Sequence, residues 1–176
     1  MSVSYLFRSI IYVLTAVFSL SALLNGYLWF NDYYLNISDS IPKGIYKINR
    51  LSKVQKNDLV LACLPDELAL EAFKKGYIFS GNCKGHYAPV GKYICATAND
   101  RVNVASDGIW VNKALLRNTA PMHGFTQDMS LTVDKILKKD EILLCAYRGK
   151  SYDSRYFGIG KTDWIRGTLE RVWIFD

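Results

Sequence analysis

Two serine hydroxyls lie two residues apart in the segment NISDSIPKGIY, which spans residues 36–46. Ser38 and Ser40 could belong to an ordinary turn, because Ser, Pro and Gly are common turn residues. A serine could instead act as a nucleophile, but its hydroxyl then needs a neighbouring group that accepts its proton. The chain has only two histidines, His86 and His123, and spacing alone leaves a Ser–His–Asp triad possible. A lysine is the other candidate base.

Lys92 could be that lysine. In the segment VGKYICA, residues 90–96, strand alternation would place Lys92 on one face with Val90, Ile94 and Ala96. Burial among apolar side chains lowers the pKa of a lysine from about 10.4 toward neutrality, which a lysine base requires. The alternative is a lysine on an edge strand whose ammonium group reaches solvent. The pattern by itself leaves both interpretations open.

Other chemistries lack the residues that they need. Neither histidine has a partner at metal-ligand spacing and no Cys-x-x-Cys pair occurs, so we expect no zinc site. The sequence has no glycine-rich phosphate loop, and we expect no cofactor. The net charge of +6 is scattered along the chain, which argues against a nucleic-acid partner and is compatible with a position beside anionic lipid.

The segment before the two serines predicts a membrane anchor. Arg8 is followed by 22 uncharged residues, long enough to span a hydrocarbon core of roughly 30 Å, and Tyr27 and Trp29 lie near the far end. We therefore expect residues 1–30 to form a cytoplasmic N-terminus and a single inner-membrane span, with residues 31–176 in the periplasm. A cleavable signal peptide is the alternative, although its apolar core is usually shorter.

The rest of the chain predicts a small, mainly antiparallel β domain. Residues 66–75 predict a short helix, acidic at its start and basic at its end. The Asp107-Gly108 pair predicts a hairpin within residues 101–113. Residues 113–128 resemble a connecting loop. Further strands are expected over residues 44–50, 58–64, 90–98, 129–134, 141–147 and 171–175.

The four cysteines allow three complete pairings in an oxidising compartment. Cys63 and Cys83 flank a loop-like insert and form the preferred disulfide. A loop of about 20 residues closed in this way would contribute roughly 3 kcal/mol to stability. Four free, buried thiols are the alternative for a cytosolic domain.

Five segments together resemble the conjugative-transfer, TraF-like branch of the signal peptidase I family. In chain order they are NISDSIPKGIY, VQKNDLVLACLP, GYIFSGNCKGHYAPVGKYICATANDRVNV, SDGIWVN and SYDSRYFGIG. They follow the order of the family behind an N-terminal apolar segment and extend almost to the C-terminus. The resemblance implies the β fold of signal peptidase I and the activity of a serine endopeptidase that matures pilins.

The resemblance also implies roles for individual residues. Ser40 matches the nucleophile and Lys92 the general base. Ser38 matches the side chain that joins the Ser40 backbone N–H in the oxyanion hole. Ser151 matches the hydroxyl that orients the lysine amine. The segment ICATAND lacks the Gly-Asp that often follows the lysine in housekeeping signal peptidases, which favours the specialised branch.

Two further pairs of residues match this branch. Asp153 and Arg155 match an ion pair that supports the catalytic site. Cys63 and Cys83 match cysteines that occur in TraF-like members. The chain has no room for the large second domain of many signal peptidases, which also argues against general secretion.

The expected function is a membrane-anchored Ser/Lys endopeptidase that cleaves, or cleaves and cyclises, a conjugative pilin or related exported precursor beside its transmembrane segment. A substrate strand would add to an exposed sheet edge. Expected partners are this precursor, the lipid bilayer and other components of a conjugation or secretion apparatus. The alternatives are a general signal peptidase I, a catalytically silent scaffold of such an apparatus, and a Ser–Lys self-cleaving repressor, against which the membrane anchor argues.

Overall fold

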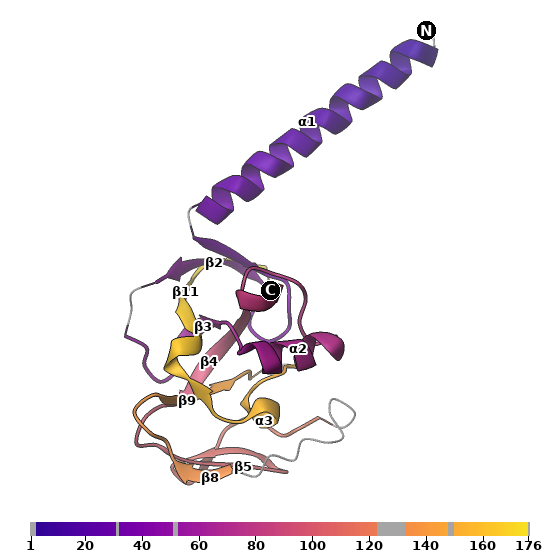
Figure 1. The fold of residues 1–176 in the computed structure, drawn as a ribbon. Coiled ribbons are helices and arrows are strands. Elements are labelled where there is room, and N and C mark those ends of the chain that lie inside the picture. The colour runs from indigo at the N-terminus through magenta and orange to yellow at the C-terminus, as the bar shows by residue number, and fades with distance from the viewer. Residues whose placement is uncertain (1–2, 31, 51–52, 123–132, 148–149, 176) are drawn as a thin grey trace. The chain divides into compact units, whose positions relative to one another are not determined.

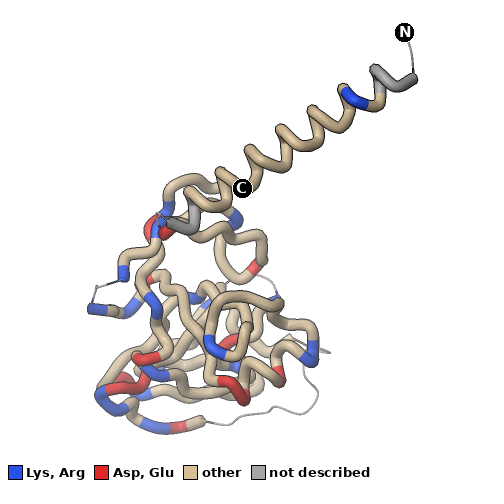
Figure 2. The backbone as a smooth tube through the Cα atoms, turned by 45° about the horizontal axis from the view of Figure 1, so that its top comes forward, with Lys and Arg blue, Asp and Glu red and all other residues tan. Residues whose placement is uncertain are grey.

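The chain divides into two compact units, Met1–Tyr34 and Leu35–Asp176. Lys and Arg are scattered among Asp and Glu along the backbone of the second unit (Figure 2). The computed structural model describes residues 3–30, 32–50, 53–122, 133–147 and 150–175 (Figure 1).

The first unit contains one long helix, α1 (Val3–Phe30). Its segment Phe7–Tyr27 is long and apolar enough to cross a membrane, and the side chains of this segment are exposed. A helix that is apolar all round has no polar face to turn toward water. One N-terminal helix of this kind fits a membrane anchor.

A seven-stranded sheet with the strand order β1-β2-β11-β3-β4-β9-β10 forms the centre of the second unit, and its edge strand β1 spans the boundary between the units. All the ladders from β2 to β10 are antiparallel. The strands are β1 (Tyr33–Asn36), β2 (Gly44–Asn49), β3 (Leu59–Ala62), β4 (Val90–Ala96), β9 (Glu141–Cys145), β10 (Gly160–Lys161) and β11 (Ile165–Ile174). The fold is therefore mainly antiparallel β, as the sequence predicts.

A four-stranded sheet has the order β7-β6-β5-β8. The Asp107-Gly108 turn joins two of its strands in the predicted hairpin, and Gly108 has the positive φ of 138° that favours glycine. Of the predicted loop 113–128 and strand 129–134, residues 123–132 lie outside the described residues. The four strands are β5 (Arg101–Ala105), β6 (Gly108–Val111), β7 (Ala114–Leu115) and β8 (Val133–Ile136).

Strand β9 separates two apolar clusters. Ile142 and Leu144 pack in one cluster with Val60 of β3, and Leu143 and Cys145 pack in the other with residues of β5 and β6. Because both faces of β9 are covered, its sequence is a continuous apolar run instead of an alternating one.

The helix α2 (Asp66–Lys74) lies within the predicted range and buries Ala69 and Ala72. A disulfide between Cys63 and Cys83, with Cα atoms 5.7 Å apart, closes the loop that contains this helix. A second disulfide joins Cys95 of β4 to Cys145 of β9. The disulfide Cys63–Cys83 is the one that the sequence favours. The alternative of four free thiols is wrong, because all four cysteines are paired.

The C-terminal strand is longer than expected. The sequence predicts a strand over residues 171–175, whereas β11 begins at Ile165, because its first half pairs with β3 and its second half with β2. Each of the two β11 ladders contains one shift in register, which interrupts the alternation of inward and outward side chains. The full length of this strand therefore depends on the strands that it pairs with. Other short elements that the sequence does not predict are α3 (Ser154–Phe157), the 3₁₀ turns Lys84–His86 and Thr162–Trp164, and strands β1, β7 and β10.

Candidate active site

The turn between β1 and β2 carries both candidate serines. Ile41, in the middle of this turn, is 1% exposed and anchors it in the domain. The hydroxyl of Tyr46, itself fully buried, donates a hydrogen bond of 2.6 Å to the Pro42 carbonyl oxygen. Gly44 lies so close to the backbone of Trp173 on β11 that a Cβ atom would collide with it. These contacts hold the turn against the sheet and leave Ser40 half-buried.

Lys92 lies opposite this turn, in the interior of the seven-stranded sheet. It is 2% exposed, and its register partner on β3 is Val60. Its Nζ atom lies 3.0 Å from Ser40 Oγ, at hydrogen-bonding distance. Because β4 is covered by β3 on one side and β9 on the other, the edge-strand interpretation of Lys92 is wrong.

The environment of Lys92 changes its proton affinity. Burial lowers the pKa of Lys92 from its ordinary value of 10.5 to about 8. The negative charge of Asp153 opposes this change, whereas the positive charge of Arg155 adds to it. A substantial fraction of the Lys92 amine is therefore neutral near pH 8, and a neutral amine can accept the proton of a hydroxyl 3.0 Å away.

Ser151 is brought to the same point from the other end of the chain. Ser151 is 3% exposed, and its hydroxyl lies 3.1 Å from Ser40 Oγ. The sequence predicts that Ser151 orients the amine of Lys92. Among the described residues, the contact of the Ser151 hydroxyl is with Ser40 instead, so Lys92 and Ser151 flank the same oxygen atom.

Asp153 and Arg155 form a buried ion pair behind Ser151. Both Nε and Nη2 of Arg155 donate to the carboxylate at 2.7 Å, and the two side chains are almost inaccessible to solvent. The backbone N–H of Ala146, just after β9, donates to the same carboxylate at 3.0 Å. The Arg155 guanidinium also donates to the carbonyl oxygens of Ala120 and Ser151. Burial opposes the charge of Arg155, but the hydrogen bond and charge of Asp153 raise its pKa.

Ser38 lies on the solvent side of the turn. It is exposed, and its hydroxyl donates a hydrogen bond of 2.7 Å to Oδ1 of Asn36. Asn36 is 1% exposed, and no role for it is predicted from the sequence. The sequence contains a signal for this contact, because an asparagine two residues before a serine in a turn is typical of an Asx turn.

The remaining candidates do not join this group. In the part of the chain that the structure describes, the side-chain contacts of Ser40 are with Lys92 and Ser151, and no three His, Cys, Asp or Glu side chains could hold a metal ion. His86 is exposed on the 3₁₀ turn Lys84–His86, and His123 lies outside the described residues.

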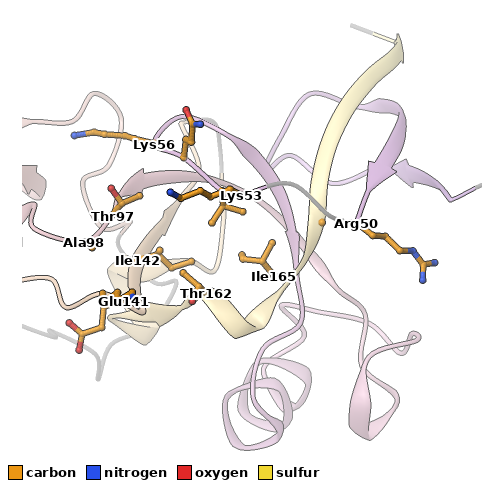
Figure 3. A pocket seen from close by; sticks show the side chains of 13 residues that line it. Arg50, Lys53, Lys56, Thr97, Ala98, Glu141, Ile142, Thr162 and Ile165 are labelled. Atoms are coloured by element: carbon orange, nitrogen blue, oxygen red, sulfur yellow. The ribbon is translucent and has the colours of Figure 1, made fainter.

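A cavity of about 660 Å³ lies elsewhere on the domain (Figure 3). None of the candidate site residues lines it. Its walls include Lys53, Lys56, Thr97, Ile142 and Ile165. The candidate active site is thus the group of close polar contacts beside the β1–β2 turn, and it is separate from this cavity.

Comparison with known proteins identifies the family. Residues 3–174 match the family described as signal peptidase, peptidase S26. The chain belongs to the S26 signal peptidase family. This membership covers both units, and it supports a serine peptidase role for the protein.

Several relatives of this chain carry conjugal-transfer names. A probable conjugal transfer protein TraF of Sinorhizobium fredii is 34% identical over 150 residues, which cover 82% of this chain and 78% of that protein. A conjugal transfer protein TraF of Agrobacterium fabrum is 31% identical, covering 82% and 84%. A plasmid transfer protein TraF of Escherichia coli is 35% identical, covering 70% and 72%. The resemblance to the TraF-like branch is therefore confirmed.

Proposed function

We propose that this protein is a membrane-anchored serine endopeptidase in which Ser40 is the nucleophile and Lys92 the general base. The observation that carries the proposal is the 3.0 Å contact between Ser40 Oγ and the Nζ atom of a buried lysine whose pKa is lowered to about 8. The membership of the S26 signal peptidase family supports a peptidase. Burying a lysine amine against a serine costs free energy, because its charged form loses hydration. A scaffold without catalysis would have no reason to keep such an unfavourable contact.

The mechanism begins with proton transfer. Neutral Lys92 takes the Ser40 proton while Oγ forms a bond to the carbonyl carbon of the substrate, and an electron pair moves to the carbonyl oxygen. The Ser38 hydroxyl and the Ser40 backbone N–H donate to this oxyanion, a contribution of roughly 3–4 kcal/mol per donor in other proteases. The carbonyl then re-forms as the C–N bond breaks, and the Lys92 ammonium returns the proton to the leaving amine.

The resulting acyl-enzyme is released by a second nucleophile. Lys92 accepts a proton from water as the water oxygen attacks the ester carbonyl, and Ser40 recovers its proton from the Lys92 ammonium. If the N-terminal amine of the substrate attacks instead, the product is a cyclic peptide that is lighter than the linear product by one water. Ser151 supports this chemistry by contacting Ser40 Oγ, and the pair Asp153 and Arg155 holds the Ser151 loop.

The proposed substrate is a conjugative pilin or a related exported precursor. The conjugal-transfer names of the relatives support this choice. The edge strand β1 ends next to the Ser40 turn, and Leu35 and Ile37 are 52% and 71% exposed there. A peptide segment in extended form could pair with such an edge. Other conjugation or secretion components are proposed as further partners.

The proposed location places catalysis at a membrane surface. We expect residues 1–30 to provide the cytoplasmic N-terminus and the anchor, and residues 31–176 to form the periplasmic peptidase domain of a single-pass inner-membrane protein. The disulfides Cys63–Cys83 and Cys95–Cys145 support an oxidising compartment. In spheroplasts, added protease should remove a C-terminal tag and leave an N-terminal tag intact; the reverse pattern would contradict this topology.

The test compares exported proteins in host cells that carry the wild type, Ser40→Ala or Lys92→Met. Mass spectrometry should show an uncleaved pilin precursor in both variants and a cleaved product, linear or lighter by one water, in the wild type. Accumulation of many secretory precursors would instead indicate a general signal peptidase. Normal maturation in both variants would leave the scaffold as the remaining interpretation.

A further inference from the structure

Asn36 makes an unusual number of contacts with the turn that carries Ser40. This last residue of β1 is 1% exposed. Its Nδ2 atom lies 2.9, 3.0 and 3.1 Å from the carbonyl oxygens of Ser38, Ile41 and Pro42, which share its two N–H donors. Its Oδ1 atom accepts hydrogen bonds from the Ser38 backbone N–H at 3.2 Å and from the Ser38 hydroxyl at 2.7 Å. One buried carboxamide thus contacts the turn at five points.

The chemistry of these contacts fixes the orientation of the Asn36 carboxamide. Three carbonyl oxygens surround one of its ends, so that end must be the NH₂ group, which is the only donor of the side chain. Two donors from Ser38 face the other end, which must therefore be the oxygen. A reversed amide would leave a buried oxygen against three carbonyl oxygens, an unfavourable arrangement.

The carbonyl groups that Asn36 holds lie on both sides of Ser40 in the sequence. The Ser38 carbonyl precedes the nucleophile, and the carbonyls of Ile41 and Pro42 follow it. Pro42 is held a second time by the hydroxyl of Tyr46. Because the backbone is fixed before and after Ser40, the peptide that contains the Ser40 N–H has little freedom. A nucleophile and an oxyanion donor both need such fixed positions.

The same carboxamide controls the second proposed oxyanion donor. A serine hydroxyl has a single proton to donate. In this structure the Ser38 hydroxyl donates it to Asn36 Oδ1. To stabilise an oxyanion, the hydroxyl must give up this bond, and a full negative charge on the substrate oxygen is the stronger acceptor.

We propose that Asn36 is a positioning residue that holds the Ser40 turn in its reactive shape and keeps the Ser38 hydroxyl until an oxyanion competes for its proton. The inference rests on the proposed peptidase function and adds a residue that acts through Ser38 and the turn, without touching the substrate. A purely structural role would predict loss of stability alone.

The test uses purified full-length enzyme in detergent and a synthetic peptide that spans the junction cleaved in a Ser40-dependent way. Asn36→Ala removes all five contacts. Asn36→Asp keeps the size and the acceptor for Ser38, but places a carboxylate oxygen against three carbonyls. For both variants we expect kcat to fall on the order of 10²-fold with little change in KM, the size expected for a displaced catalytic group.

Two measurements separate positioning from general destabilisation. In Asn36→Ala, the acid midpoint of the pH–kcat profile should stay that of the wild type, because burial and the charges of Asp153 and Arg155 set the pKa of Lys92 and the variant changes no charge. The double variant Asn36→Ala/Ser38→Ala should lose less activity than the product of the two single losses, because the two residues act on the same oxyanion. Additive losses would refute the link between Asn36 and Ser38.

Asn112, another asparagine whose side chain forms hydrogen bonds within a turn, serves as a control. Asn112 accepts a hydrogen bond from the Arg101 backbone N–H and donates to Asp100, and its φ of 50° suits glycine. Asn112→Gly should leave kcat unchanged even if the melting temperature changes.

The outcomes distinguish this inference from the proposed function. Full kcat in folded Asn36→Ala would overturn the positioning role, and if that variant does not fold, Asn36→Asp decides in the same way. Cleavage by Ser40→Ala at the wild-type rate would overturn the peptidase mechanism itself, whatever the Asn36 variants do.

Discussion

The hydroxyls of Ser40 and Ser151 lie 3.1 Å apart, although 111 residues separate them in the chain. Ser40 lies in the turn after β1, and Ser151 precedes Asp153, the N-cap of α3. The amine of Lys92 on β4 reaches Ser40 Oγ as well. Three distant segments therefore meet at one oxygen atom.

Ser151→Ala should slow the reaction without unfolding the domain. The variant removes a hydrogen bond to Ser40 Oγ, and one such bond contributes roughly 1.5 kcal/mol at most, about tenfold in rate. Steady-state kinetics with a cleaved peptide should show this loss in kcat. A loss as large as that of Ser40→Ala would mean that Ser151 takes part directly in proton transfer.

Lys92→Arg should be inactive although it keeps a positive charge. A guanidinium stays protonated at all accessible pH values, so it cannot accept the Ser40 proton. Lys92→Met should be inactive for the same reason. Lys47→Met, which changes an exposed lysine on β2, serves as a control and should retain full activity. Activity in Lys92→Arg would exclude the lysine-base mechanism.

Activity should rise with pH and reach half its maximum near the lowered pKa of Lys92, about 8. Asp153 raises this pKa and Arg155 lowers it. Asp153→Asn should therefore move the midpoint to lower pH, and Arg155→Met should move it to higher pH. Profiles of kcat against pH for folded variants check both directions, and shifts of the same sign would contradict this electrostatic account.

Lys92→Met should stabilise the fold at neutral pH. Unfolded Lys92 titrates near 10.5 and the folded residue at about 8, so between these values the unfolded state binds more protons and wild-type stability rises with pH. The gain in unfolding free energy of Lys92→Met over the wild type should reach its full size, on the order of 3 kcal/mol, below pH 8. This gain should decrease as the pH rises toward 10.5. Denaturant titrations at several pH values measure it, and a difference independent of pH would contradict the lowered pKa.

Breaking the buried ion pair should destabilise the domain. Asp153→Asn leaves the Arg155 charge buried without its carboxylate partner, which typically costs about 3–5 kcal/mol. The exposed pair Arg101–Asp134 provides a matched control, since Asp134→Asn should cost less than about 1 kcal/mol. Equal losses of unfolding free energy in the two variants would show that burial is not the reason for the effect.

The sequence by itself determined the local elements that a short run of neighbouring residues specifies. Alternation, apolar runs and turn residues predicted the strands from β2 to β6, and the Asp107-Gly108 pair predicted the hairpin. Acidic residues at its start and basic residues at its end predicted the helix α2. The loop pattern gave the pairing of Cys63 with Cys83. The order of five motifs indicated the family, and it selected Ser40 and Lys92 where their own patterns left two interpretations open.

Only the tertiary structure decided features that depend on distant segments. Whether Lys92 lies at an edge or in the interior depends on which strands pair with β4, and that pairing with β3 and β9 buries the amine and lowers its pKa. The contact of Ser151 with Ser40 depends on how the segment after β9 folds back. The role of Asn36 arises from carbonyl groups that converge only when the turn forms, because a hydrogen bond needs direction and distance that residue order does not specify.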